Sequence, residues 1–279
     1  MEELLEFIER EDLEGFRLSI HQAGSLAGFK DSVGSTLVHA TAIYSAFEIL
    51  NAMIEHVINI KESENSTYEE IQDWVNEKNT EGNSALIFAS MSGSLEIIKV
   101  LLKHGADVNG YNLESKNAIH FAAEKDFPHI ISYLSSQGAE LTRSSSNFQT
   151  PIHLAVLMNS YRSTGVLLAL RVTRKRQDHN GHTALHLAAK NNNGRIVRLL
   201  LFKGFDPSVR DKTGKTAEDL TADPQIKGLF HSAGILQVFG YRPMVADGKK
   251  TNFTPFITLG VLILSVFVVN SVFLETCNV

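Results

Sequence analysis

Four histidines recur at one position of a repeated sequence pattern, and their side chains are the first in this chain that could bind a metal. They are His39, His120, His153 and His186. Zinc holds imidazole nitrogens at about 2.1 Å, so the ligands of one ion must lie close together. The last three histidines are equally spaced in the sequence and belong to different structural units. Because packed helical units lie roughly 10 Å apart, the pattern predicts a structural role for these side chains and no metal site.

Motifs for other kinds of chemistry are not found in the sequence. It contains no Gly-x-Ser-x-Gly, no His-Glu-x-x-His and no glycine-rich phosphate loop. The single cysteine, Cys277, leaves no internal disulfide and no cysteine nucleophile in the part that precedes it. A formal charge of -5 gives no overall basic footprint for nucleic acid. We therefore expect no enzyme, no cofactor, no small-molecule substrate and no nucleic-acid partner.

A period of about 33 residues organises most of the chain. The strings SALIFAS, NAIHFAA, TPIHLAV, TALHLAA and TAEDLTA begin at Ser84, Asn117, Thr150, Thr183 and Thr216. A second apolar cluster follows each of the first four strings, and in three units a glycine (Gly105, Gly138 or Gly204) suits the end of a second helix. One helix–turn–helix unit cannot bury its own apolar face, whereas stacked neighbours share a continuous core.

This pattern resembles the ankyrin repeat. The motif Thr-Pro-Leu-His-x-Ala is nearly complete at residues 150–155 and 183–188, and GSLEIIKVLLKHGADVN at residues 93–109 is close to a typical second helix and turn. The resemblance implies an all-α ankyrin-repeat solenoid of about seven helix–turn–helix units, terminal caps included. It also implies that the recurring histidine forms hydrogen bonds across neighbouring turns and that the extended surface binds proteins.

The expected units can be placed along the chain. Residues 1–33 are predicted to form an N-terminal capping repeat with acidic outer positions, and residues 34–234 the ankyrin repeats. A degenerate repeat begins at Thr36, and its distance from Ser84 exceeds one period, so an insertion is expected near 62–76. The last repeat is shortened after Pro224 and is expected to end at 231–234.

An uncharged run of 19 residues follows the repeats, from Phe256 through Leu264 to Leu274. At about 1.5 Å per residue this run can cross a hydrocarbon core of roughly 30 Å. We predict a transmembrane helix at 255–274 between a linker at 235–254 and a short tail at 275–279. Two alternatives to a membrane span fit this run less well. A signal peptide would lie at the N-terminus, and a helix of a soluble core would need a second apolar layer to pack against.

Charges beside the predicted span set its expected orientation. Lys249 and Lys250 precede it and no basic residue follows it, so the positive-inside rule places the N-terminal part in the cytosol, as in a tail anchor. The tail without bases favours the endoplasmic reticulum or secretory pathway over the mitochondrial outer membrane. The sequons at Asn65 and Asn252 should then remain without glycan.

The turn after the repeat at Thr150 departs from the ankyrin pattern. It reads RVTRKR at 171–176 in place of Gly-Ala-Asp-Val-Asn, and Arg174 stands where a valine normally packs inward. The turn is either locally distorted and solvated or a basic finger for an acidic protein surface or anionic lipid headgroups. The candidate contact residues are Arg171, Arg174, Lys175 and Arg176.

The insertion is a second candidate for partner binding. Its apolar residues Ile71, Trp74 and Val75 fit one helix face and either pack back onto the array or form a recognition loop, since tryptophan is enriched in binding hot spots. Tyr111 is a further aromatic candidate.

Two functions fit the sequence. The first is a membrane-anchored ankyrin scaffold or adaptor that binds a protein partner at the cytosolic face of a membrane. The alternative is a regulatory fragment or degenerate relative of ankyrin-type DHHC palmitoyltransferases, in which ankyrin arrays precede membrane helices. That catalytic domain needs a cysteine-rich motif and several spans, whereas this chain has one cysteine and one predicted span.

Overall fold

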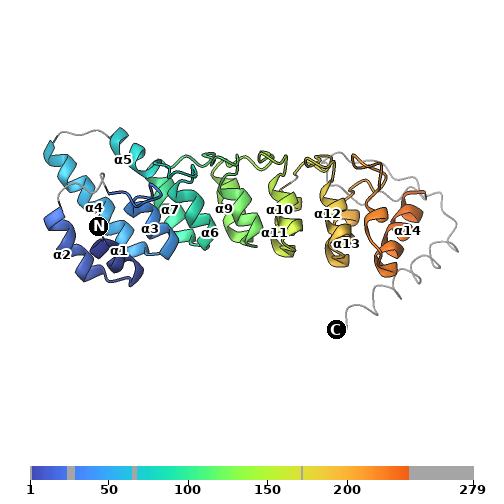
Figure 1. Ribbon diagram of the computed structural model, residues 1–279, viewed down its shortest axis with the longest axis horizontal. Coiled ribbons are helices and arrows are strands. Elements are labelled where there is room, and N and C mark those ends of the chain that lie inside the picture. Colours follow the sequence, from blue (N-terminus) through green and yellow to red (C-terminus); the bar gives the residue numbers. More distant parts are fainter. Residues whose placement is uncertain (1, 24–28, 65–67, 171, 239–279) are drawn as a thin grey trace, which may run out of the picture. The chain divides into compact units, whose positions relative to one another are not determined.

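The computed structural model describes residues 2–23, 29–64, 68–170 and 172–238, and these residues fold into pairs of antiparallel helices (Figure 1). The first members of the pairs are α1 (Glu2–Glu9), α3 (Leu37–Tyr44), α6 (Ala85–Ser92), α8 (Ala118–Glu124), α10 (Pro151–Leu157), α12 (Ala184–Lys190) and the short 3-10 helix η1 (Glu218–Leu220). The second members are α2 (Leu13–Ala23), α4 (Phe47–Glu64), α7 (Leu95–Lys103), α9 (Pro128–Ser136), α11 (Tyr161–Ala169), α13 (Gly194–Phe202) and α14 (Pro224–Val238). In these described ranges the pairs number seven, which agrees with the prediction.

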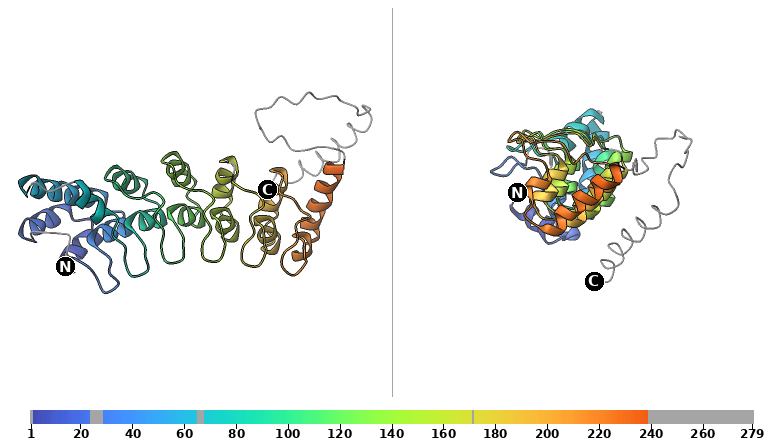
Figure 2. Two further views of the ribbon diagram at one scale, coloured as in Figure 1. Left: turned by 90° about the horizontal axis from the view of Figure 1, so that it is seen from above. Right: turned by 90° about the vertical axis from the view of Figure 1, so that its right-hand side faces the viewer.

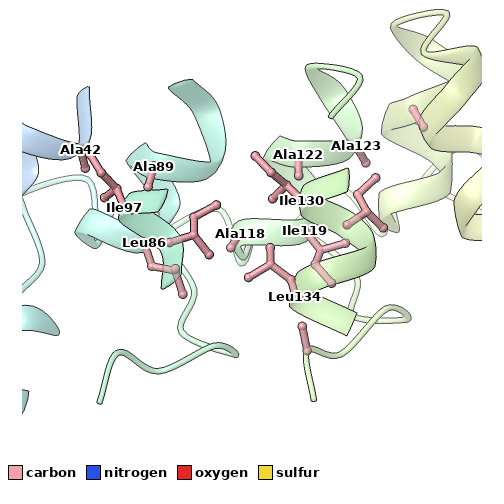
Figure 3. Packing of buried hydrophobic residues seen from close by; sticks show 14 of the residues in the cluster. Ala42, Leu86, Ala89, Ile97, Ala118, Ile119, Ala122, Ala123, Ile130 and Leu134 are labelled. Atoms are coloured by element: carbon pink, nitrogen blue, oxygen red, sulfur yellow. The ribbon is translucent and has the colours of Figure 1, made fainter. Parts of the chain in front are cut away.

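Successive pairs stack through their first helices, with α3 against α6, α6 against α8, α8 against α10 and α10 against α12. An alanine on each of four of these helices is fully buried and allows the close approach: Ala89, Ala122, Ala155 and Ala188. Figure 3 shows Ala89 and Ala122 beside Ile97 and Ile130 of the second helices. The equivalent leucines of the second helices, Leu101, Leu134, Leu167 and Leu200, are also fully buried. One apolar core therefore runs through all the pairs.

The predicted insertion consists of a lengthened α4 and the extra helix α5 (Tyr68–Val75). The repeat pattern resumes at Asn76, whose equivalent in the next repeat is Asn109. Both side chains bind the following turn in the same way: the N–H of Asp107 donates to Asn76 Oδ1 at 2.7 Å, and the N–H of Glu140 donates to Asn109 Oδ1 at 2.8 Å. The inserted residues thus leave the repeat register intact.

The C-terminal end of the array differs from the prediction. Helix α14 continues to Val238 and so includes the first residues of the expected linker. Among the residues that the structure describes, no helix has both the length and the apolar character needed to cross a membrane. The predicted span, with Phe256, Leu264 and Leu274, lies outside the described residues, and so does the tail.

Candidate partner-binding surface

The loops between pairs form short hairpins that line up along one side of the helices (Figure 2). Isolated bridges close several of them at the base, as between Tyr111 and Asn117. A backbone hydrogen bond of 2.9–3.1 Å joins each tip to the tip before it. The donor N–H groups belong to Thr80, Leu113, Ser146, His179 and Lys212. The acceptor carbonyl oxygens belong, in the same order, to Val33, Glu81, Glu114, Asn147 and Asn180. Side chains at neighbouring tips are therefore held at fixed spacing along one row.

The recurring histidines position these hairpins. In His39, His153 and His186 the Nδ1 atom accepts the backbone N–H of the threonine that precedes the helix, so the proton is on Nε2. The Nε2 atoms of His39, His120, His153 and His186 reach carbonyl oxygens of the next hairpin at 3.0–3.3 Å. Burial lowers the pKa of His120 and of His153 to about 4. The histidines therefore form the hydrogen bonds between neighbouring turns that the family resemblance implies.

Tyr111 lies on the exposed side of its hairpin, with 45% of its surface accessible. The guanidinium carbon of Arg143 lies 3.8 Å from the ring centroid, and Nζ of Lys78 lies 5.0 Å from it. Nζ of Lys78 also donates to the carbonyl oxygen of Tyr111 at 2.7 Å. These cation–π contacts fix the ring on the surface between basic side chains.

The basic turn that includes residues 172–176 follows the same backbone course as the equivalent turns of other repeats, although its sequence differs from theirs. Val172 is buried, and its N–H bonds the carbonyl oxygen of Leu167 at 3.4 Å, against 2.9–3.1 Å for the same bond in the neighbouring repeats. Arg174 is half-buried, and its Nη1 reaches the next turn at Gly204. Lys175 and Arg176 are exposed, whereas Arg171 lies outside the described residues. The geometry thus keeps two of the four predicted basic residues on the open surface.

Trp74 does not lie on that surface. Its side chain is 7% exposed and belongs to the core together with Ile71 and Val75, so of the two alternatives the structure favours packing onto the array. An amphipathic helix turns its tryptophan towards the apolar neighbour, because this buries the largest apolar area. The recognition-loop alternative for Trp74 is therefore not favoured, because its side chain is covered by the array.

A division of charge along the array escaped the sequence reasoning. Residues 1–149 carry 23 acidic and 10 basic side chains, whereas residues 150–231 carry 6 acidic and 13 basic ones. The net charge of the whole chain hides this division, and only a count of charges by segment would have revealed it. The last two hairpins contribute five exposed bases: Lys175, Arg176, Arg210, Lys212 and Lys215.

Two carboxylates of these hairpins are turned inward towards a histidine. Asp178 and Asp211 are buried on either side of His182, whose ring nitrogens lie 3.6 and 3.5 Å from them. The Thr213 hydroxyl and the backbone N–H groups of Lys215 and Thr213 lower the pKa of Asp211 to about 2. Two acids remain near the exposed bases, because Asp206 lies near Lys175 and Asp219 lies near Arg210 and Lys215. The hairpin surface is basic overall.

Comparison with known proteins identifies the class. The family model described as "Ankyrin repeats (3 copies)" matches residues 4–112, 65–145 and 119–211. These matches together span more than half of the chain, which therefore belongs to the ankyrin-repeat family.

Among solved structures, the chain is similar to the crystal structure of the human ASB11 ankyrin repeat domain. The TM-score is 0.70 at 21% identity, over 82% of this chain and 96% of that one. At this identity the likeness shows the fold alone. No curated protein matches, and none of these findings supports the resemblance to palmitoyltransferases.

Proposed function

We propose that the protein is an ankyrin adaptor, anchored in a membrane by residues 256–274, that binds a protein partner at the cytosolic face. The observation that carries the binding part is the row of hydrogen-bonded hairpin tips, which presents exposed bases at fixed spacing while the nearby carboxylates Asp178 and Asp211 are buried. Ankyrin arrays use such extended surfaces to hold partners.

The anchoring part is supported by the sequence. Residues 256–274 carry no charge, and Lys249 and Lys250 precede them, which favours a cytosolic array under the positive-inside rule. An anchor raises the concentration of the array at the membrane, so that a modest affinity suffices for a partner that is also there. We favour the endoplasmic reticulum or the secretory pathway.

Two measurements test the anchor. Residues 249–279 fused behind a fluorescent protein should give an endoplasmic-reticulum or secretory pattern. A mitochondrial rim would contradict the assigned membrane, and a diffuse signal would contradict the anchor. In the whole protein, a sequon added after Val279 should acquire glycan while Asn65 and Asn252 remain bare, and glycan on Asn65 would reverse the orientation.

Site-specific photo-crosslinking in cells tests the binding surface. A photoreactive residue in place of Arg176, which is exposed in the basic part, should give discrete protein adducts. The same residue in place of Lys125, which is also exposed and lies in the acidic part between α8 and α9, is the control. Identical adducts at both positions, or none at Arg176, would contradict binding through the basic hairpins.

A further inference from the structure

The conformation of Phe148 at a hairpin tip is unusual for its residue type. At this position the other hairpins have Gly34, Gly82, Ser115, Gly181 and Gly214, all with positive φ between 58° and 81°. Phe148 adopts φ 59° at the same position. A bulky side chain is rare in this left-handed region, and such residues are retained where the surrounding structure or a function requires them.

Packing gives a second reason why glycine is expected there. A Cβ atom added at Gly82 would lie 2.9 Å from the N atom of Leu113, and one at Gly181 would lie 2.6 Å from the N atom of Lys212. The hairpin of Phe148 instead accommodates a whole aromatic ring next to the following tip. The ring stacks on His179, with the centroids 6.4 Å apart and the planes 20° apart.

This strained aromatic residue is not used to build the core, because 58% of its surface is exposed. Leu113, at the tip of the hairpin before it, is 75% exposed. On the other side the row continues through His179 to the exposed bases Arg176, Arg210 and Lys212. Along this single row of bonded tips, the exposed apolar side chains of Leu113 and Phe148 are thus followed by exposed basic side chains.

We propose that the Phe148–His179 pair is an aromatic anchor site for an extended acidic segment of a partner protein. A bulky apolar side chain of that segment packs on the exposed Phe148 ring and against Leu113, and its acidic residues lie over Arg176, Arg210 and Lys212. This inference rests on the proposed protein-binding function and names the chemistry of the partner. The charge of the last hairpins selects an acidic segment over a basic one.

The stacking also favours a protein partner over a lipid surface. The ring is held nearly parallel to the imidazole of His179, and 58% of the surface of Phe148 stays exposed. Aromatic residues, phenylalanine among them, are enriched in protein–protein interfaces.

The test uses the whole protein in nanodiscs of neutral lipid, with a displayed library of random short peptides as the probe. Wild type should enrich peptides in which a bulky apolar residue lies within a run of Asp and Glu. Phe148→Gly should weaken the binding of such a peptide by about tenfold or more. Phe202→Ala is the matched control, because Phe202 is 59% exposed but lies on α13, and it should leave the affinity unchanged.

Stability measurements separate loss of the site from loss of the fold. Glycine relieves the positive φ of residue 148, so the variant should melt no lower than wild type. Phe148→Asn, which also tolerates this conformation, should lose binding to the same extent.

Several outcomes would overturn the anchor site. They are enrichment of no peptides or of basic ones, equal binding by Phe148→Gly, and competition by anionic lipid when it replaces the neutral lipid of the nanodisc. Adducts at Arg176 that persist in Phe148→Gly would leave the proposed function standing while refuting this inference.

Discussion

The acidic and the basic parts of the array share one backbone design but differ in charge. Leu101 in the acidic part and Leu200 in the basic part are both fully buried, and His120 and His153 both reach a carbonyl group of the following hairpin. Yet acids outnumber bases by 23 to 10 in residues 1–149, and bases outnumber acids by 13 to 6 in residues 150–231. The residues that recur in each repeat fix the fold, so exposed positions are free to diverge.

The largest expected effect tests whether the two parts have equivalent cores. Leu101→Ala and Leu200→Ala should each lower the free energy of unfolding by about 2–5 kcal/mol, because each removes a fully buried side chain and leaves a cavity. Urea unfolding of both variants measures this loss. The exposed Lys190→Ala is the control and should stay within roughly 0.5 kcal/mol. A small loss for only one leucine would show that the cores differ despite their common pattern.

The second prediction uses pH and compares one histidine from each part. Burial lowers the pKa of His120 and His153 to about 4, below the value of about 6.5 for an unfolded histidine. As pH falls from 6.5 towards 4, the unfolded chain therefore binds protons that the folded chain does not, and stability decreases. Between pH 7 and pH 5 the loss should be about 2 kcal/mol for each histidine.

Urea unfolding at several pH values measures this loss. His120→Gln and His153→Gln lower the stability at pH 7, but each should make the pH dependence less steep by a similar amount. A pH dependence that is unchanged by either substitution would mean that the histidine titrates alike in both states.

A third, smaller effect concerns the hairpin tips and bears on Phe148. Gly181 and Gly214 both have φ of +81°, but a Cβ at Gly181 would lie 2.6 Å from the N atom of Lys212, whereas a Cβ at Gly214 would meet no atom within 4 Å. Gly214→Ala should cost about 1 kcal/mol through backbone strain alone, and Gly181→Ala about 2 kcal/mol or more. Equal losses in thermal unfolding would show that neighbouring tips shift freely, which would weaken the case that Phe148 is held in place.

Much of this fold could be predicted, because stacking imposes the same demands on each repeat. The buried alanines and leucines, the histidine and the turn glycines recur at fixed spacing, and each has one physical role. The last repeat was expected to end at 231–234, yet α14 continues to Val238. Propensity alone is a weak guide at a terminus.

The candidate site was harder to predict, since exposure depends on neighbours that no local pattern specifies. Trp74 was predicted as one of two alternatives, and only the packing of α5 shows it to be buried. The repeat pattern does not single out Phe148, because this residue lies outside the apolar positions of the motif. The alignment of Phe148 with the glycines of other hairpins was nevertheless visible in the sequence. Phe148 is unusual because it adopts a left-handed conformation that favours glycine.

The smallest expected effect on stability separates charges that hold the fold from charges available for binding. Lys175 and Arg176 are exposed, so Lys175→Gln with Arg176→Gln should change the free energy of unfolding by no more than roughly 0.5 kcal/mol. The same pair should weaken binding of an acidic peptide severalfold at low salt and much less at high salt, because exposed charges are screened beyond a Debye length of about 10 Å at 0.1 M. Isothermal titration at two salt concentrations measures this difference. A loss of affinity that is equal at both would mean that the basic part acts through shape and not through its charge.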